Sequence, residues 1–281
     1  MQVRRAKTAG FCMGVGLALK KLDQALAKGS QGKIYTLGPL IHNPQVLKSY
    51  EAKGVVCAEA GTNFEAKDLV VIRAHGIPEK FELALRKQGV TVIDATCPRV
   101  KNAQLAIAKS TAKGAALLLF GEADHPEVRG LISYAKGPSL VVGSDCDLSK
   151  LKVPLAQGLV LASQTTQDRE AFLELERRSK AFYPELVVLS TICDATRHRQ
   201  EEARAIAEQV EIMVVVGGRQ SGNTRRLADV AAAKGIETIL IETQAELKAD
   251  FFAGKSIVGL TAGASTPKDV IDATEECLKQ F

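Results

Sequence analysis

Three unbroken apolar runs constrain the fold of this 281-residue chain more than any other feature of its sequence. They are LVVI at 69–72, ALLLF at 116–120 and IMVVV at 212–216. A strand with one solvated face alternates apolar and polar residues, whereas a strand buried on both faces is a continuous Val/Ile/Leu run. Such strands belong to parallel sheets that helices cover. The sequence therefore predicts an α/β protein.

Short β-rich runs alternate with helical patterns along the chain, as a parallel α/β fold requires. The predicted strands are 33–37, 69–73, 90–94, 115–120, 140–143, 159–162, 186–190, 211–216, 237–241 and 256–260. The predicted helices are 15–28, 44–53, 79–88, 99–113, 126–135, 169–182, 196–209, 224–234 and 267–279.

The cysteines indicate how the chain is divided. Cys12, Cys97 and Cys193 each stand between a β-rich segment and a helical segment, and they are 85 and 96 residues apart. Length alone suggests about two domains. The repeated context indicates three α/β units of similar size instead. We expect them at 14–97, 98–192 and 193–281, with the N-terminal segment 1–13 packing near the third unit.

Three thiolates supplied by three such units could form a metal site, because a helix N-terminus at a strand end favours a thiolate. With no fourth equivalent cysteine, they could hold an iron–sulfur cluster with one open iron, or zinc with an open position. The spacing does not choose between the two. No C-x-x-C pair is present, which excludes a zinc ribbon or a thioredoxin-type site. Cys57, Cys146 and Cys277 are expected to be small buried packing residues.

Three of the four histidines, His42, His75 and His125, fall in loops that follow predicted strands. Ligands of open α/β sheets bind beyond the carboxyl ends of the strands, so these loops are candidates for a binding site. A structural capping role is the alternative for each. The fourth histidine, His198, is flanked by Arg197 and Arg199 on a charged helix and is expected at the solvated surface.

Glu127 has two interpretations. Asp124-x-x-Glu127, with Pro126 between them, has the form of a capping box at the start of a helix. A glutamate beside a histidine at a strand end could equally donate a proton to a substrate. The pattern leaves both open.

Three loops rich in small hydrogen-bonding residues follow predicted strands: SQTTQ at 163–167, GGRQSGNT at 217–224 and TAGASTP at 261–267. Glycine allows close backbone approach, and Ser, Thr and Asn offer hydroxyl and amide groups, so such loops can surround phosphate oxygens. The chain has neither the G-K-[ST] ending of a P-loop nor a G-x-G-x-x-G turn after its opening strand, which argues against an ATPase or a dinucleotide-dependent dehydrogenase.

The charge balance is mildly basic, with 37 Lys and Arg against 32 Asp and Glu. A scattered excess of +5 suits an anionic small molecule and indicates neither nucleic acid nor membrane as a partner. The apolar start at 9–19 is interrupted by glycines and runs into Lys20 and Lys21, unlike a secretory signal. We expect a cytoplasmic protein with reduced thiols.

Nine segments then occur in an order and at spacings that resemble one known family. From the N-terminus they are GFCMGV, GPLIHNPQV, RAHG, DATCPRV, DHPEV, SQTT, CDATRHRQ, SGNT and TAGAST. Together they resemble the 4-hydroxy-3-methylbut-2-enyl diphosphate reductases, which act last in the methylerythritol phosphate route to isoprenoids. The resemblance extends over residues 10–270, nearly the whole chain.

The resemblance implies three α/β units in a pseudo-threefold (trefoil) arrangement around a central 4Fe–4S cluster, one per chain, held by Cys12, Cys97 and Cys193. It implies an iron–sulfur oxidoreductase that converts (E)-4-hydroxy-3-methylbut-2-enyl diphosphate to isopentenyl diphosphate and dimethylallyl diphosphate by reductive dehydroxylation. The hydroxyl oxygen of the substrate would bind the open iron. Electrons would come singly from an external donor such as ferredoxin or flavodoxin.

Site roles also follow from the resemblance. Glu127 would deliver the proton, with Thr165 and His125 as the other catalytic residues. The substrate-binding residues would be His42, His75, His125, Thr165, Ser221, Gly222, Asn223 and Ser265. The chain departs from the family at Ser221–Gly222–Asn223, where many members have two serines before the asparagine, so a backbone N–H or a water would replace one hydroxyl here.

Two other functions remain open. A three-cysteine iron–sulfur dehydratase of the quinolinate-synthase type would perform an elimination without net reduction. A non-catalytic protein could instead use a cluster to sense a phosphorylated metabolite. A requirement for a low-potential reductant distinguishes the first, and turnover distinguishes the second.

Overall fold

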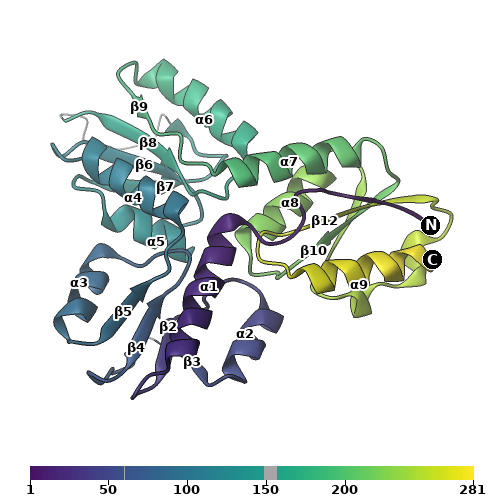
Figure 1. The fold of residues 1–281 in the computed structure, drawn as a ribbon. Coiled ribbons are helices and arrows are strands. Elements are labelled where there is room, and N and C mark those ends of the chain that lie inside the picture. The colour runs from purple at the N-terminus through teal and green to yellow at the C-terminus, as the bar shows by residue number, and fades with distance from the viewer. Residues whose placement is uncertain (60, 149–156) are drawn as a thin grey trace. The chain divides into compact units, whose positions relative to one another are not determined.

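The computed structural model describes residues 1–59, 61–148 and 157–281. Within them, helices alternate with strands, and the strands form three separate four-stranded sheets in which every pairing is parallel (Figure 1). The predicted α/β class and its three parallel sheets are therefore confirmed.

The backbone divides into two compact units. Unit 1 comprises Met1–Gly16, Ile41–Ser49 and Cys193–Phe281, and it contains one sheet. Unit 2 comprises Leu17–Leu40 and Tyr50–Ile192, and it contains the other two.

The first sheet of unit 2 has the strand order β3-β2-β4-β5. Its strands are β2 (Ile34–Leu37), β3 (Val55–Ala58), β4 (Leu69–Ile72) and β5 (Thr91–Asp94). All four residues of β4, the predicted LVVI run, are buried, and β2 and β5 pair with its two edges. Helix α3 (Glu79–Lys87) packs Leu85 into the same core as Val70 and Ile72.

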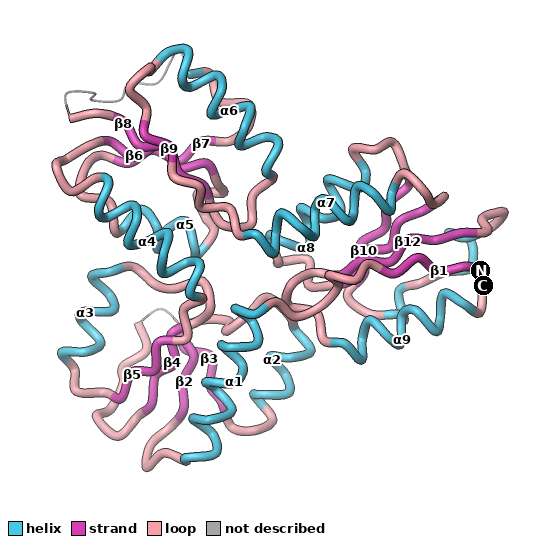
Figure 2. The backbone as a smooth tube through the Cα atoms, turned by 45° about the horizontal axis from the view of Figure 1, so that its top comes forward, coloured by secondary structure: helices cyan, strands magenta, loops and turns pink. Residues whose placement is uncertain are grey.

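The second sheet of unit 2 has the order β7-β6-β8-β9. Its strands are β6 (Ala116–Phe120), β7 (Ser139–Val142), β8 (Leu159–Ser163) and β9 (Val187–Val188). Leu118 packs with α6 (Arg169–Phe182) on one face, and Leu117 and Leu119 pack with α4 (Pro98–Ser110) and α5 (Pro126–Ser133) on the other (Figure 2). Both faces of β6 are therefore buried, which explains its unbroken apolar run.

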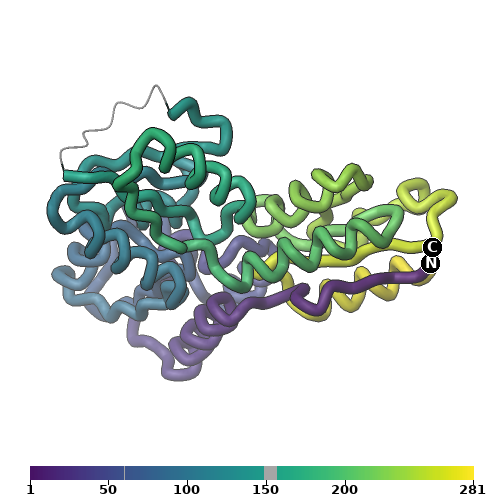
Figure 3. The backbone as a smooth tube through the Cα atoms, turned by 90° about the horizontal axis from the view of Figure 1, so that it is seen from above, coloured from purple at the N-terminus to yellow at the C-terminus, as the bar shows by residue number. Residues whose placement is uncertain are grey.

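The sheet of unit 1 has the order β1-β12-β10-β11. Its strands are β1 (Gln2–Arg5), β10 (Ile212–Val216), β11 (Glu237–Ile241) and β12 (Ile257–Ala262). Helices α7 (Asp194–Ala207) and α8 (Gly222–Ala232) cover one face, and α9 (Lys268–Lys279) covers the other. The chain ends lie together, since the Met1 amino group donates to the Lys279 carbonyl at 3.3 Å (Figure 3).

The chain passes between the units at four points, and two of these lie within helices, α1 (Met13–Lys28) and α2 (Pro44–Glu51). With these, each of the nine predicted helices is present. Short 3-10 helices at Gln244–Glu246 and Ala249–Phe252 separate β11 from β12. In the described part of the chain, no helix is long and apolar enough to cross a membrane.

Candidate active site

The predicted site residues of unit 2 all lie just beyond the carboxyl ends of strands. His75 follows β4, Cys97 follows β5, His125 follows β6 and Thr165 follows β8. The strands of each sheet are parallel, so these loops are at the edge where α/β proteins bind ligands.

Thr165, in the loop after the neighbouring strand β8, forms two hydrogen bonds with the Glu127 carboxylate. The Thr165 backbone N–H donates to Oε1 of Glu127 at 2.6 Å, and the Thr165 hydroxyl donates to Oε2 at 3.0 Å. Glu127 is only 2% exposed. The helix cap is His125 instead, whose Nδ1 accepts the Glu127 backbone N–H at 3.1 Å. The capping-box interpretation of Glu127 is therefore wrong.

The same burial changes the protonation of Glu127. Desolvation raises the pKa of its carboxyl to about 7, against the opposing effect of the two hydrogen bonds from Thr165. A carboxyl with this pKa is partly protonated near neutral pH, which is the condition that a general acid requires. Glu127 can therefore hold and release a proton.

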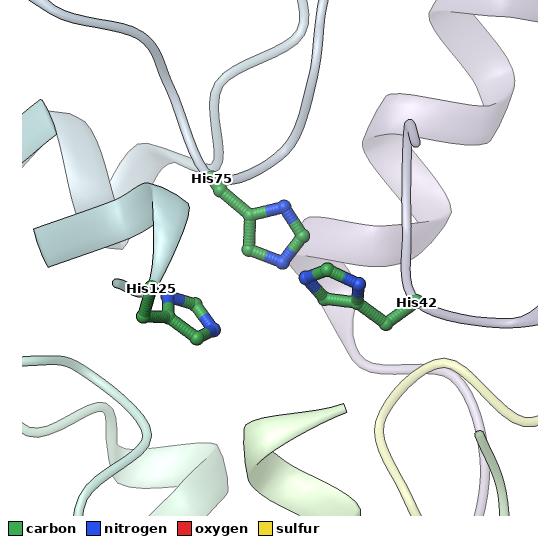
Figure 4. Close-up of side chains that lie close together, drawn as sticks. All are labelled: His42, His75 and His125. Carbon is green, nitrogen blue, oxygen red and sulfur yellow. The ribbon is translucent and has the colours of Figure 1, made fainter. Parts of the chain in front are cut away.

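His75 and His125 lie edge to face, with ring centroids 5.6 Å apart and ring planes at 77° (Figure 4). Because Nδ1 of His125 accepts a backbone N–H, the neutral ring carries its proton on Nε2. Figure 4 also labels His42, which belongs to unit 1 and is described with that unit.

The anion-binding candidates of unit 1 gather around the loops that follow β10 and β12. Ser221 is the N-cap of α8 and its hydroxyl accepts the Thr224 N–H at 3.3 Å, while the Ser265 hydroxyl donates to the His42 carbonyl at 3.1 Å. Asn223 is 6% exposed, and its buried Nδ2 has no hydrogen-bond partner in the residues that the structure describes. Such an amide is satisfied if a ligand oxygen reaches it.

Glycines let these loops approach closely. A methyl group at Gly218 would overlap the His42 carbonyl oxygen, and one at Gly263 would overlap the Thr224 hydroxyl. The segments that carry His42, Asn223 and Ser265 are therefore packed more tightly than any side chain at these two positions would allow.

The three candidate ligand cysteines share one local setting. Cys97 is the N-cap of α4 and Cys193 the N-cap of α7, and neither thiol caps its helix with a hydrogen bond. Cys12 directly precedes α1, and its Sγ accepts the Val15 N–H at 3.4 Å. Cys12 and Cys193 belong to unit 1 and Cys97 to unit 2. All six cysteines are within the described residues, and none forms a disulfide.

These thiols fit an iron–sulfur group in their chemistry. Each stands partly exposed at the start of a helix, where a thiolate is favoured. Thiolates are the usual ligands of iron–sulfur clusters. Arg199, a buried cation, also acts electrostatically on Cys12 and Cys193, which suits an anionic group between them.

The other three cysteines differ from one another. Cys57 is exposed on β3, an edge strand, so the expectation that it is buried is wrong. A strand with one neighbour lacks cover on its outer side, which leaves the Cys57 thiol in contact with solvent. Cys146 is half-buried against the core of the second sheet, and Cys277 is half-buried on α9.

Sequence reasoning missed Arg199. His198 is exposed, as expected, but Arg199 beside it is only 5% exposed. The signal was present, because the buried face of α7 contains Thr196, Arg199, Gln200, Ala203 and Ala207. Helical periodicity places residue 199 on that face.

Fold and site together define an enzyme with parallel α/β sheets whose proton-donating, anion-binding and thiol groups stand at the carboxyl ends of its strands. A family model described as LytB protein matches residues 3–279, so the chain belongs to the LytB family. Two relatives carry the name 4-hydroxy-3-methylbut-2-enyl diphosphate reductase. That of Desulfovibrio desulfuricans is 60% identical over 286 residues, covering 100% of both chains. That of Aquifex aeolicus is 42% identical over 279 residues, covering 98% of this chain and 95% of the relative.

Solved structures agree. A structure of (E)-4-hydroxy-3-methyl-but-2-enyl diphosphate reductase, described as the terminal enzyme of the non-mevalonate pathway, is 40% identical with a TM-score of 0.72 and covers 100% of both chains. The E-1-hydroxy-2-methyl-but-2-enyl-4-diphosphate reductase of Plasmodium falciparum is 25% identical with a TM-score of 0.94, covering 99% of this chain and 88% of that one. The family resemblance seen in the motifs is confirmed, and the chain is an oxidoreductase.

Proposed function

We propose that this chain catalyses the reductive dehydroxylation of (E)-4-hydroxy-3-methylbut-2-enyl diphosphate to isopentenyl diphosphate and dimethylallyl diphosphate. The carbon–oxygen bond of the allylic alcohol breaks and a carbon–hydrogen bond forms. Two electrons and two protons enter, and one water leaves. The names of the relatives support this substrate, since the most similar of those described above is aligned over the full length of both chains.

A 4Fe–4S cluster is the cofactor of this proposal, with Cys12, Cys97 and Cys193 as its ligands. The cluster supplies single electrons and a Lewis acid for the substrate hydroxyl. The setting of the three thiols, each at the start of a helix, supports this ligand set.

Glu127 is the proton donor in this proposal, and its burial is the observation that carries it. Hydroxide is a poor leaving group, so departure needs a proton at that oxygen. The Glu127 carboxyl, with its pKa near 7, holds a proton at neutral pH and sits rigidly between two donors of Thr165. Thr165 and His125 orient this carboxyl: the threonine hydrogen-bonds its oxygens, and the histidine caps its helix.

The diphosphate is bound, in this proposal, by His42, Ser221, Gly222, Asn223 and Ser265 of unit 1 and by His75 and His125 of unit 2. Backbone N–H groups at the start of α8 attract anions, and Asn223 presents an amide that has no partner in the described residues. Binding energy from this remote group orients the short carbon chain for reaction.

An external one-electron carrier such as ferredoxin or flavodoxin supplies the electrons, and the enzyme acts in the cytoplasm. The reaction consumes two electrons, which an external donor must supply, and reduced thiols are typical of proteins in the cytoplasm.

The test begins with anaerobic purification and analysis of iron and sulfide. The purified protein is then mixed with substrate and a low-potential reductant, and the diphosphate products are measured in a single turnover. Glu127→Gln should retain the cluster and lose turnover by on the order of 10²-fold or more. Asp124→Asn, in the loop just before α5 and with a fully exposed side chain, is the control and should react normally.

Other outcomes would contradict the proposal. An active, folded protein without iron would exclude the cluster. Conversion without a reductant would indicate a dehydratase, and binding of a cluster and a phosphorylated metabolite without turnover would indicate a sensor. Normal turnover by Glu127→Gln would remove Glu127 from the mechanism.

A further inference from the structure

Arg199 is a buried cation in unit 1. It lies on α7, less than two turns after Cys193, and only 5% of it is exposed. Charged side chains are almost never this deeply buried unless a partner compensates them. The hydrogen bonds of its guanidinium show which backbone segments Arg199 connects.

The guanidinium connects the two cysteine-bearing segments of unit 1. Its Nη2 donates to the carbonyl of Gly10 at 2.7 Å, and its Nη1 donates to the carbonyl of Ala195 at 3.1 Å. Gly10 is two residues before Cys12, and Ala195 is two residues after Cys193. One rigid group therefore fixes both backbones from which the thiols project.

These hydrogen bonds do not neutralise the charge. Carbonyl oxygens are neutral, and the buried Nε of Arg199 has no hydrogen-bond partner in the described residues. Glu202 is a nearby carboxylate that compensates part of the charge, but its hydrogen bonds go elsewhere: its oxygens accept from the N–H of Lys7 at 2.8 Å, the N–H of Thr8 at 2.9 Å and the Thr8 hydroxyl at 2.6 Å.

Besides Glu202, the groups that act on the charge of Arg199 are the thiols of Cys12 and Cys193. Burial lowers the pKa of the guanidinium, and Cys12, Cys193 and Glu202 act in the opposite direction. An arginine keeps its charge even so. A buried positive charge next to two thiols is stabilised when those sulfurs, or a group bound to them, are anionic.

We propose that Arg199 is a positioning residue and fixed counter-charge for the anionic cluster bound by Cys12 and Cys193, an inference that rests on the proposed cluster. Its two guanidinium hydrogen bonds fix the backbone of the segments that carry Cys12 and Cys193. Its charge makes reduction of the cluster easier. Reduction adds an electron, and a nearby positive charge in a poorly solvated place favours the more negative state.

Three variants of the anaerobically purified holoenzyme separate these roles. Arg199→Gln removes the charge, and Arg199→Lys keeps the charge without the two-pronged fork. Arg197→Gln is the matched control, because it removes a charge from the same helix where the side chain is 34% exposed and pairs with Glu201.

The midpoint potential of each variant is measured by redox titration followed by electron paramagnetic resonance. Arg199→Gln should lower the equilibrium constant of one-electron reduction at least tenfold, a fall of 59 mV for a one-electron couple. Arg199→Lys and Arg197→Gln should each change it less than threefold. Hydrogen exchange at the backbone amides of residues 10–13 should accelerate in both Arg199 variants and not in Arg197→Gln.

An unchanged potential in Arg199→Gln would overturn the proposal, as would an equal fall in Arg197→Gln. If Arg199→Gln does not fold, Arg199→Lys carries the test, and a tenfold loss there would overturn the role of the charge. Failure of the proposed cluster is a separate result, because wild-type protein would then contain no iron or sulfide, and failure of the proposed reaction is seen in turnover rather than in the potential.

Discussion

Glu127 shows what one buried carboxyl costs the folded protein. Its pKa is near 4.5 in water and about 7 in the fold, so the folded state binds the proton more tightly than the unfolded chain does. Stability is therefore unaffected below pH 4.5, falls as the pH rises from 4.5 to about 7, and stays reduced above that. The total cost is on the order of 3 kcal/mol.

Glu127→Gln should remove this pH dependence. A glutamine oxygen can still accept the Thr165 N–H, and its amide can donate to the Thr165 hydroxyl. Between pH 5.5 and pH 8, the wild type should lose about 2 kcal/mol of unfolding free energy relative to the variant. Anaerobic urea denaturation at a series of pH values measures the difference.

Asp124→Asn provides the reference for this series, because Asp124 is fully exposed and its charge contributes little. If Glu127→Gln and the wild type change in parallel with pH, the carboxyl is not held in its neutral form by burial.

The sequence predicted the chemistry of single residues better than their partners. The pattern Asp124-x-x-Glu127 is a valid capping box, and no local signal could reject it. The deciding contact comes from Thr165, 38 residues away, which only the folded sheet brings within reach. Arg199 is different, because the period of its own helix already placed it on the buried face.

At the scale of elements, the interior strands and the helices were predictable because their apolar patterns are strong. Strands β1 and β3, both at sheet edges, were absent from the predicted strands, and the sequence of β1, QVRR, has no apolar run. Helices α7 and α8 begin two residues earlier than predicted. Their N-caps are Cys193 and Ser221, and cysteine is not a residue that signals a helix start.

Gly263 tests the close packing between the β12 loop and α8. A methyl group there overlaps the Thr224 hydroxyl and should displace the first turn of α8, where Thr224 donates to Ser221. Gly263→Ala should cost about 1–3 kcal/mol of unfolding free energy and weaken binding of a diphosphate analogue. Denaturation and calorimetric titration measure the two effects.

A double-mutant cycle tests whether the overlap with Thr224 causes the loss of stability in Gly263→Ala. In a Thr224→Ala background the nearest clash is gone, so Gly263→Ala should cost much less. Gly16→Ala, in α1 with open space around the added methyl, should be neutral or slightly stabilising. Equal costs in both backgrounds would show that the loss arises elsewhere.

At the scale of the whole molecule, the sheet of unit 1 is assembled from both ends of the chain. Val3 of β1 pairs with Val258 of β12, and Arg5 forms ion pairs with Asp272 at 2.7 Å and Glu275 at 2.9 Å. Two neighbouring strands of this sheet therefore come from opposite ends of the sequence.

Deleting residues 1–5 should loosen unit 1 selectively. The deletion turns β12 into an edge strand and removes both ion pairs of Arg5. Hydrogen exchange followed by mass spectrometry should show faster exchange in β12 and unchanged exchange in β4 and β8 of unit 2. Equal acceleration in both units, or none in β12, would contradict this picture.

The joined chain ends also have a consequence for synthesis. Cys12 leaves the ribosome 181 residues before Cys193, and β12 and α9 come later still. At about 5–20 residues per second, the segment that carries Cys12 waits roughly 10–40 seconds for the segment that carries Cys193. Unit 2 has all its residues by Ile192 and can fold during translation. Unit 1 starts first and finishes last, so the segments that carry Cys12 and Cys193 can meet only after all of unit 2 has been made.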